Sequence, residues 1–438
     1  MRISVIGTGY LGAVHAVCMA QLGHTVVGVD VDEEKVAALS DGRAPFYEPG
    51  LDELLSSTLD TGRLSFTSSF AAGADADVHF VCVGTPQRAG EFAADLTYVE
   101  GAADLLAPYL RRPTLVVGKS TVPVGTAARI GRRIQAAAPA GAGVELAWNP
   151  EFLREGHAIE DTMHPDRLVY GVTSPAATEL LDQVYAGPIG SGTPRLVTDL
   201  ATAELVKAAA NSFLATKISF INAMSEVCEA AGADVVALAD ALGYDDRIGR
   251  KFLGAGLGFG GGCLPKDIRA FMARAGELGA DQALTFLREV DAINQRRRSR
   301  MVDLAREQCE GSFLGHRIGV LGAAFKPESD DIRDSPALNV AAQIRLQGGH
   351  VTVHDPRALD NARKAWPDLT YSESVEETCQ GATVVLHLTE WQQYGEIDPA
   401  ELGRIVKHKR LVDGRNTLDA AAWRAAGWTY RALGRHTA

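Results

Sequence analysis

The sequence predicts an α/β protein with a doubly wound sheet, a helical middle section and a second α/β domain. Short β-branched runs alternate with helical patterns over residues 1–199, as in parallel βαβ units with helices on both sheet faces. A long run without Gly or Pro follows at 200–231, and strand-like runs return near residue 315. We therefore place the domains at 1–199, 200–312 and 313–438.

Length and charge limit the classes of function. With roughly 150 residues per domain, 438 residues predict about three domains. The 43 Lys and Arg against 55 Asp and Glu leave a net charge of −12, which argues against a nucleic-acid or anionic-membrane surface. A bound anion must therefore be held by a few local cations. No apolar stretch approaches about 18 residues and no leader pattern precedes the first glycine turn, so we expect a cytoplasmic protein without a membrane partner.

The first domain is expected to contain six strands. Each is a short run rich in β-branched residues, and apolar residues at helical spacing lie between several of them. The strands are expected at 3–6, 25–30, 78–83, 114–117, 144–148 and 167–171, and the clearest helices at 11–22, 98–110 and 126–137.

The middle section is expected to be helical at 200–231 and at 266–308, with an interruption near Gly279. Residues 254–265 between these helices are rich in glycine, so helix and strand propensity are both very low there. Such glycine density is typical of backbone that approaches a ligand closely. The last domain is expected to have strands at 317–321, 351–354, 383–388 and 410–413, with a helix at 337–346.

Gly7-Thr8-Gly9-Tyr10-Leu11-Gly12 is a G-x-G-x-x-G motif that follows a strand and opens a helix. Gly7 permits a tight turn, Gly9 lets a pyrophosphate approach the backbone, and Gly12 allows close packing of the helix. Asp30 ends the second strand and would accept hydrogen bonds from the adenosine ribose. Its charge would repel a 2′-phosphate and no Arg follows before Lys35, so NAD is favoured over NADP. Residues 256–261 match the same motif without a preceding strand, so the motif is informative only in context.

Cys263 is a candidate nucleophile. The six cysteines show no CxxC and no Cys/His pairing, which disfavours a disulfide framework and a metal site such as zinc. Cys263 ends the glycine-rich loop at the start of a helix, three residues before Lys266 and four before Asp267. A thiol near a cation and a helix N-terminus is readily ionised. The alternative is a buried core cysteine.

Two further groups of polar residues invite a catalytic interpretation. Lys207 and Asn211 are spaced i, i+4 on the long helix and could stabilise an oxyanion, or they could belong to a solvated helix face. Residues 118–123 and 149–156 each follow a strand, at the carboxyl edge where open sheets bind ligands. Glu151 and Glu155 could supply a general base or orient a hydroxyl. The alternative readings are a turn at 118–123 and ordinary carboxylates in the first turn of a helix.

Taken together, these segments resemble the UDP-glucose/GDP-mannose dehydrogenase family over the whole chain. The resemblance implies two Rossmann-like doubly wound domains, the first for NAD and the last for the sugar nucleotide, joined by a central helical dimerisation domain. It also implies a homodimer or higher homo-oligomer. The motifs that carry it are 7–12, 81–86, 119–123, 149–156, Lys207 with Asn211, 258–267, 324–333 and 413–415.

The resemblance also implies roles for individual residues. Cys263 is the implied nucleophile, Lys207 and Asn211 stabilise the oxyanion, Asp267 and Thr121 surround a catalytic water, and Glu151 is linked to thioester hydrolysis. The implied NAD contacts outside the glycine motif are Asp30, Lys35, Thr85, Ser120, Thr121 and Arg333, with Glu155 and Lys266 near nicotinamide or substrate. The implied substrate contacts are Glu151, Phe152, Leu153, Lys207, Asn211, Phe252, Gly260, Lys326 and Arg415, with Arg247 reaching in from a partner subunit.

Local sequence favours the UDP-glucose branch of the family, because Arg247-Ile248-Gly249 precedes Phe252-Leu253. The implied reaction is a two-step, NAD-dependent oxidation of UDP-glucose to UDP-glucuronate through a thiohemiacetal and a thioester on Cys263. Gly262 departs from the family, which usually has Ser there. The alternatives are a sibling enzyme acting on GDP-mannose or a UDP-N-acetylhexosamine, a one-step dehydrogenase of the 3-hydroxyacid or 6-phosphogluconate type, and a non-enzymatic sensor or scaffold.

Overall fold

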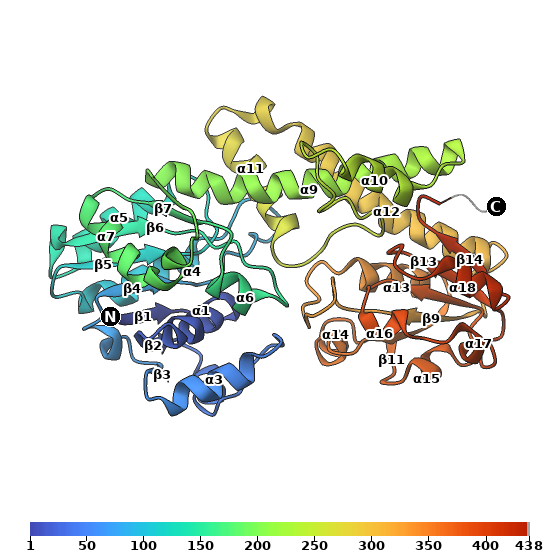
Figure 1. Ribbon diagram of the computed structural model, residues 1–438, viewed down its shortest axis with the longest axis horizontal. Helices are drawn as coiled ribbons and strands as arrows, with labels where there is room; N and C mark the ends of the chain where they lie inside the picture. The colour runs from blue at the N-terminus through green and yellow to red at the C-terminus, as the bar shows by residue number, and fades with distance from the viewer. Residues whose placement is uncertain (436–438) are drawn as a thin grey trace. The chain divides into compact units, whose positions relative to one another are not determined.

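The structure, a computed structural model, describes residues 1–435 (Figure 1). The chain forms two compact units, one of residues 1–210 with 269–279 and the other of residues 211–268 with 280–438. Each unit contains one sheet, and the predicted fold class is confirmed: two parallel-sheet α/β domains with a helical region between them in the sequence. Within residues 1–435, every helix is too short or too polar to span a bilayer.

The first unit has an eight-stranded sheet in the order β3-β2-β1-β4-β5-β6-β7-β8. Its strands are β1 (Arg2–Ile6), β2 (Thr25–Val29), β3 (Leu64–Thr67), β4 (Val78–Val81), β5 (Thr114–Gly118), β6 (Val144–Trp148), β7 (Leu168–Gly171) and β8 (Arg195–Thr198). The expectation of parallel strands throughout is wrong at one place, because β7 runs antiparallel to β6. The connection between these strands holds only a six-residue helix, α6, and so lacks the long crossover helix typical of a parallel neighbour.

Helices cover both faces of this sheet because successive strand side chains point to opposite faces. On β1, Val5 packs with Phe80 in one core, while the next residue, Ile6, packs with Val116 in the other. All four side chains are buried. The helices of this unit are α1 (Tyr10–Gln21), α2 (Glu33–Ser40), α3 (Leu51–Asp60), α4 (Thr97–Leu106), α5 (Thr126–Ala137), α6 (Ala158–Met163), α7 (Pro175–Val184) and α8 (Ala186–Gly190).

Long helices follow in the chain, as predicted. Helix α9 (Leu200–Ala231) has the expected bounds, since no Gly or Pro interrupts it. The predicted interruption near Gly279 is confirmed, because Gly279 has a φ of 76° and separates α11 (Leu264–Glu277) from α12 (Phe286–Gln308). Helix α10 (Val235–Gly243) lies between α9 and the glycine-rich loop in the sequence. Residues 254–263 form neither helix nor strand.

The second unit has a six-stranded parallel sheet in the order β11-β10-β9-β12-β13-β14. This order repeats that of the first six strands of the other sheet. Gly322 follows β9 with a φ of 117° and donates to His354 O (2.7 Å), as Gly7 follows β1 and donates to Val29 O (2.8 Å). The strands are β9 (Arg317–Leu321), β10 (His350–His354), β11 (Thr370–Tyr371), β12 (Val384–His387), β13 (Arg410–Asp413) and β14 (Thr429–Ala432). The helices are α13 (Pro336–Leu346), α14 (Leu359–Ala365), α15 (Val375–Cys379), α16 (Gln392–Gly395), α17 (Pro399–Leu402) and α18 (Ala420–Ala425).

Candidate active site

The glycine motif forms the turn from β1 into α1. Gly7 has a φ of 87°, which L side chains rarely adopt, and a Cβ on Gly12 would lie 1.8 Å from the Gly7 carbonyl oxygen. Both glycines are therefore required by the fold itself. A Cβ on Gly9 would meet no atom within 4 Å, so internal packing does not explain this glycine. Open backbone at the N-terminus of α1 fits a bound pyrophosphate.

Asp30 lies at the end of β2 beside this turn. Its carboxylate accepts hydrogen bonds from Thr8 N (2.7 Å), Asp32 N (3.1 Å) and Lys35 Nζ (3.1 Å). Burial alone would raise the pKa of Asp30, but these hydrogen bonds and the Lys35 charge lower it overall. Asp30 is thus an ionised acceptor whose most mobile partner is Lys35, with a quarter of its side chain exposed. This arrangement fits a ribose held by Asp30 and Lys35.

A buried carboxylate that the sequence analysis missed connects α1 to the loop after β6. Glu48 accepts hydrogen bonds from Gly156 N and Ala158 N (both 2.6 Å), and the Tyr10 hydroxyl also donates to it. Gly156 N lies 3.2 Å from the Tyr10 hydroxyl as well. Burial and the adjacent Glu48 carboxylate raise the pKa of Tyr10 far above its ordinary value. Tyr10 is therefore a fixed hydrogen-bond donor that holds the segment containing Glu155.

The ends of β4, β5 and β6 meet at one edge of the sheet, as predicted. Thr85 Oγ1 donates to Thr121 O (2.8 Å), and Ser120 Oγ donates to Val83 O (2.6 Å). Lys119 donates to Asn149 Oδ1 (3.1 Å) and to Tyr185 Oη (3.2 Å). Lys119 is only 7% exposed, and its burial lowers its pKa to about 8. The polar side chains on this edge are thus fixed to the loops that follow the neighbouring strands.

Glu151 and Lys207 form an ion pair in the first unit, with Lys207 Nζ 3.0 Å from Glu151 Oε1. The other carboxylate oxygen of Glu151 accepts from Leu153 N (2.7 Å), and Lys207 Nζ lies 5.6 Å from the centre of the Phe152 ring. The side chains are 7% (Lys207) and 12% (Glu151) exposed. The solvated-face interpretation of Lys207 is therefore wrong. The alternative of first-turn helical carboxylates is also wrong, because residues 151–157 form a loop and α6 begins at Ala158.

Cys263 directly precedes α11 in the second unit. Its carbonyl oxygen accepts from Asp267 N (2.9 Å), which closes the first turn of that helix, and Cys263 is exposed whereas the other five cysteines are buried. The core-cysteine alternative is therefore wrong for Cys263. Asp267 is 4% exposed and accepts from Asn211 Nδ2 (2.7 Å), while the Lys266 ammonium pairs with its other oxygen. Asn211, Lys266 and Asp267 thus form one polar network beside the turn that follows Cys263.

The backbone of the glycine-rich loop is hydrogen-bonded to a side chain of α12. Asn294 on α12 accepts from Phe259 N (2.8 Å) and donates to Phe259 O (2.9 Å). A Cβ on Gly258 would lie 2.3 Å from Asn294 Oδ1, and a Cβ on Gly260 would lie 2.4 Å from Asp334 O. These glycines are required because the loop runs closely against α12 and the segment before α13. The backbone that leads to Cys263 is therefore fixed in position.

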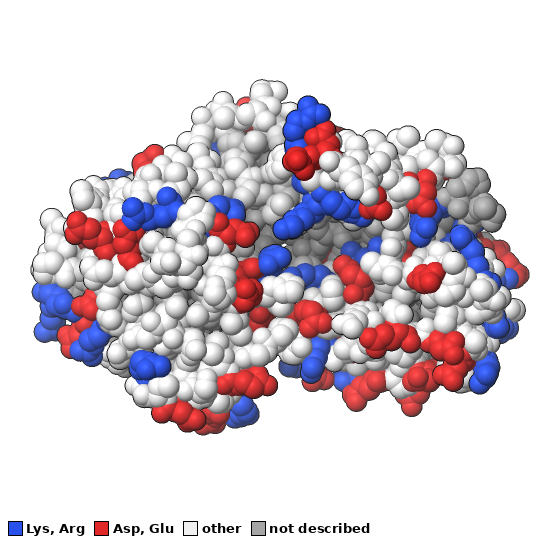
Figure 2. All heavy atoms as spheres, viewed as in Figure 1, with Lys and Arg blue, Asp and Glu red and all other residues white. Residues whose placement is uncertain are grey.

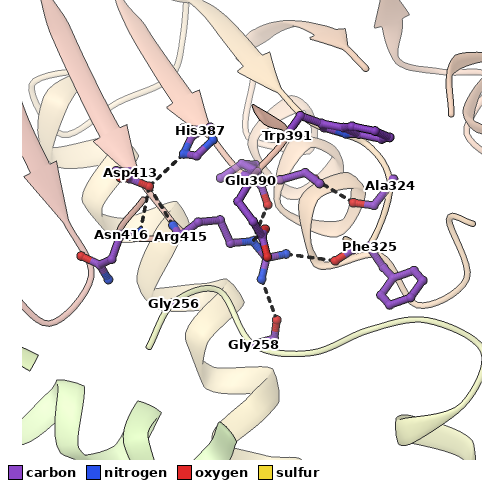
Figure 3. Close-up of polar contacts among 12 residues, drawn as sticks. Gly256, Gly258, Ala324, Phe325, His387, Glu390, Trp391, Asp413, Arg415 and Asn416 are labelled. Carbon is purple, nitrogen blue, oxygen red and sulfur yellow. Dashed lines mark hydrogen bonds and ion pairs between the residues drawn. The ribbon is translucent and has the colours of Figure 1, made fainter. Parts of the chain in front are cut away.

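Arg415 ties the same loop to the second sheet (Figure 3). It donates to Gly258 O (3.0 Å), Phe325 O (3.2 Å) and Leu388 O (2.7 Å), and it pairs with Glu390 (3.1 Å). Beneath it, the buried Asp413 accepts from Arg415 N, Asn416 N and His387. Burial would raise the pKa of Asp413, but His387 and the backbone donors lower it to about 2. Arg415 is thus heavily occupied by protein acceptors.

Some predicted residues have different surroundings from those of the networks above. Arg247 has an 88% exposed side chain that pairs with Asp245 (2.7 Å). Arg333 has a 64% exposed side chain that pairs with Asp331 (2.7 Å), and a Cβ on Gly262 would lie 2.2 Å from its guanidinium carbon. The two remaining predicted substrate contacts are Phe252, which has a φ of 67°, and Lys326, whose ammonium lies 5.8 Å from the centre of the Phe325 ring.

These arrangements have a clear chemical capacity. The first unit offers a turn and an aspartate for a dinucleotide, together with a buried carboxylate–ammonium pair. The second offers an exposed thiol at a helix N-terminus and a buried amide–carboxylate network. A thiol with such neighbours can act as a nucleophile, and the ammonium and amide can stabilise a developing oxyanion.

Comparisons with known proteins agree with this capacity. Residues 1–188 match the NAD binding domain of the UDP-glucose/GDP-mannose dehydrogenase family, residues 201–296 its central domain and residues 319–420 its UDP binding domain. The chain is 42% identical to a UDP-glucose 6-dehydrogenase of Rhizobium meliloti, over 99% of this chain and 100% of the relative. It is 40% identical to UDP-glucose 6-dehydrogenase TuaD of Bacillus subtilis, over 99% and 93%.

A solved structure of a UDP-glucose dehydrogenase from Pyrobaculum islandicum is 40% identical, with a TM-score of 0.91 over 99% of this chain and 98% of that one. The three domain models of one family match consecutive parts of the chain, and two relatives are about 40% identical over nearly its full length. The chain therefore belongs to the UDP-glucose/GDP-mannose dehydrogenase family, and it is an NAD-dependent dehydrogenase.

Proposed function

We propose that the chain is a UDP-glucose 6-dehydrogenase, which oxidises UDP-glucose to UDP-glucuronate in two steps with one water consumed. The observation that carries this proposal is the full-length identity of about 40% to several curated enzymes of that name. The match of residues 319–420 to a UDP binding domain supports the nucleotide part of the substrate.

The site residues divide the chemistry between them. Residues 7–12, Asp30 and Lys35 would hold NAD, which would supply the hydride acceptor for each oxidation. Lys207 and Asn211 stabilise the negative oxygen on the reacting carbon. The Cys263 sulfur bonds to the aldehyde carbon, whose oxygen takes up a proton, and the second oxidation converts this thiohemiacetal to a thioester. Water then attacks the thioester carbon, the carbon–sulfur bond breaks, and Asp267 or Glu151 takes up the proton of the water.

The remaining predicted contacts are part of the same proposal. Thr121, on the loop after β5, helps to place the water, and Thr85, Ser120, Glu155, Lys266 and Arg333 contact NAD. Phe152, Leu153, Phe252, Gly260, Lys326 and Arg415 line the substrate. We keep the domain boundaries 1–199, 200–312 and 313–438, which enclose the three matched ranges.

We also propose a homodimer or higher homo-oligomer, in which Arg247 reaches a partner subunit. Its support is an exposed apolar stripe on α9, where Phe213, Phe220 and Val227 recur every seven residues with exposures of 67%, 48% and 57%. The cytoplasm is the proposed location. All six cysteines lie among the described residues and none is in a disulfide, which fits a reducing compartment.

The test is the number of NADH formed per sugar, measured with limiting UDP-glucose and excess NAD. The proposal requires two, whereas a one-step dehydrogenase gives one. Parallel reactions with GDP-mannose and a UDP-N-acetylhexosamine identify a sibling substrate. If none of the three sugars yields NADH, the remaining alternative is a non-enzymatic sensor or scaffold.

Cys263→Ser should not release the acid, because an alkoxide is a poor leaving group and the ester is hydrolysed slowly. Two NADH per sugar at the normal rate from this variant would overturn the thiol mechanism.

A further inference from the structure

Glu204 is a buried carboxylate on α9 that the chemistry above does not use. It is 2% exposed, and both of its oxygens are occupied by backbone donors of another element. Oε2 accepts from Gly125 N (2.7 Å) and Oε1 accepts from Ala127 N (2.6 Å). The side chain of one helix thus holds the beginning of another.

The start of α5 needs such a partner. The first N–H groups of a helix have no acceptor within the helix and are usually capped by a local Ser, Thr, Asp or Asn. Helix α5 instead has Gly125 at its N-cap, with a φ of 92° and no side chain to accept a hydrogen bond. Glu204 supplies the missing acceptor, and its charge favours the positive end of the helix.

The loop between β5 and α5 is thereby fixed at both ends. Near β5, Ser120 Oγ donates to Val83 O and Thr85 Oγ1 donates to Thr121 O. Near α5, Arg274 Nε donates to Val124 O (2.9 Å) in addition to the two contacts of Glu204. Glu204 lies three residues before Lys207, so it joins the loop that carries Thr121 to the helical turn that carries Lys207.

Holding a carboxylate in this place has an energetic cost. Burial raises the pKa of Glu204 from its ordinary 4.5 to about 7, although the N–H donors of Ala127 and Gly125 and the charge of Arg274 lower it. Arg274 is the charged group that faces Glu204 from α11. A side chain whose ionised form is disfavoured by its surroundings, next to proposed catalytic groups, is a candidate for a functional role.

We propose that Glu204 is a positioning residue for the dehydrogenase reaction. It fixes the position of the Thr121 loop relative to Lys207 on α9. This inference rests on the proposed function, in which Lys207 acts on the substrate and Thr121 helps to place the water. The hydrogen bonds that Glu204 accepts come from backbone N–H groups of the protein rather than from a reacting group. Its loss should therefore lower kcat more than it raises KM.

Glu204→Gln tests this proposal with little change in shape. The amide oxygen can accept one N–H, but the amide nitrogen then faces the other N–H as a second donor. We expect kcat with UDP-glucose and NAD to fall about tenfold or more, because misplacement near 1 Å can cost about 10²-fold in rate. KM for both should change less than about threefold. Glu204→Asp keeps the charge with a shorter reach and should have an intermediate kcat.

The matched control is Asp77→Asn in the same unit. Asp77 accepts from Arg2 N (2.9 Å) at the start of β1, away from the carboxyl ends of the strands, so its loss destabilises the same sheet. The melting temperature of the Asp77→Asn variant should fall, while its kcat should equal that of the wild type. An unchanged kcat in both Glu204 variants, or an equal fall in kcat in Asp77→Asn, would overturn the proposal. An inactive wild-type enzyme would instead contradict the proposed function.

Stability as a function of pH provides a second readout that is independent of activity. The folded state binds the Glu204 proton more tightly than the unfolded chain, so this stabilisation is present below pH 4.5 and is lost as the pH rises through about 7. The free energy of unfolding of the wild type, relative to Glu204→Gln, should therefore decrease between pH 5 and pH 8. Urea unfolding at several pH values measures this difference. A constant difference would show that burial does not raise the pKa of the Glu204 carboxyl in the folded state.

Discussion

The surroundings of Lys207 favour a role in the reaction more than its position on a helix does. Its ammonium is nearly buried and pairs with Glu151 at 3.0 Å, and it lies beside the Phe152 ring. Removing one partner of such a pair leaves the other charge buried without compensation. Removal of the Lys207 ammonium would therefore leave the Glu151 carboxylate nearly buried without this opposite charge.

Lys207→Ala should lower kcat by about 10²-fold or more, on the scale of a lost oxyanion donor. Steady-state NADH formation measures the loss, and Lys207→Arg, which keeps the charge, serves as the control. Full activity in Lys207→Ala would reduce the ion pair with Glu151 to a structural contact.

Gly262 is the position at which the family resemblance implies a Ser. A Cβ at this position would overlap the guanidinium of Arg333, whose side chain is flexible and 64% exposed. A larger residue therefore displaces Arg333 rather than the backbone, and Arg333 is a proposed NAD contact.

Gly262→Ser should raise KM for NAD by up to about fivefold, the scale of one exposed ion pair, with kcat nearly unchanged. The control is Arg333→Ala, which should raise KM for NAD to the same degree. If the two substitutions raise KM independently when combined, the displacement of Arg333 is not the cause.

Among the elements, α12 stands out because one of its side chains forms both hydrogen bonds to the glycine-rich loop at Phe259. Asn294 is fully buried, and its amide satisfies the N–H and the C=O of the same residue. The loop has few side chains of its own to fix it, so its conformation depends on this helix.

Asn294→Ala should lower the free energy of unfolding by about 2 kcal/mol or more, because two buried backbone groups lose their partners. Urea unfolding measures this, and the rate of Cys263 alkylation should change as the loop loosens. Asn339→Ala, which breaks only a contact with Gln343 within α13, should leave that rate unchanged.

The elements also show how far the sequence can predict this structure. The bounds of α9 were predictable because no Gly or Pro interrupts the run, whereas β3 and β8 were missed because edge strands are short and partly exposed. The orientation of β7 depends on a strand pairing that no local pattern encodes.

The site shows the same limit. Asp30 and Cys263 lie in local motifs, so the sequence alone singles them out as candidates. Glu48, Glu204 and Asn294 were missed because their partners are backbone groups 35 to 110 residues away in the sequence.

At the scale of the whole molecule, the surface is mixed in charge. Figure 2 shows both acidic and basic side chains on the face in view, and the net charge of the whole sequence is −12. Such a surface keeps a protein dispersed without favouring one polyanionic or polycationic partner. The α9 stripe of Phe213, Phe220 and Val227 offers apolar contacts for association with a second copy.

Phe220→Asp should convert the proposed dimer or higher oligomer to monomers, because it places a charge at the centre of the α9 stripe. Sedimentation velocity measures the change. Leu346→Asp is the matched control, since Leu346 is 79% exposed on α13 and should not affect the mass. An unchanged mass in Phe220→Asp would show that α9 is not the contact.

The six cysteines differ in exposure, so one of them can be modified selectively. Burial raises the pKa of Cys18, Cys82 and Cys379 to about 12 and that of Cys309 to about 11, and it also raises the pKa of Cys228. Cys263 alone among the six is exposed. A soft electrophile should therefore label the native protein once per chain and report directly on the proposed nucleophile. Because Cys263 is the proposed nucleophile, oxidation of this exposed sulfur should also inactivate the enzyme.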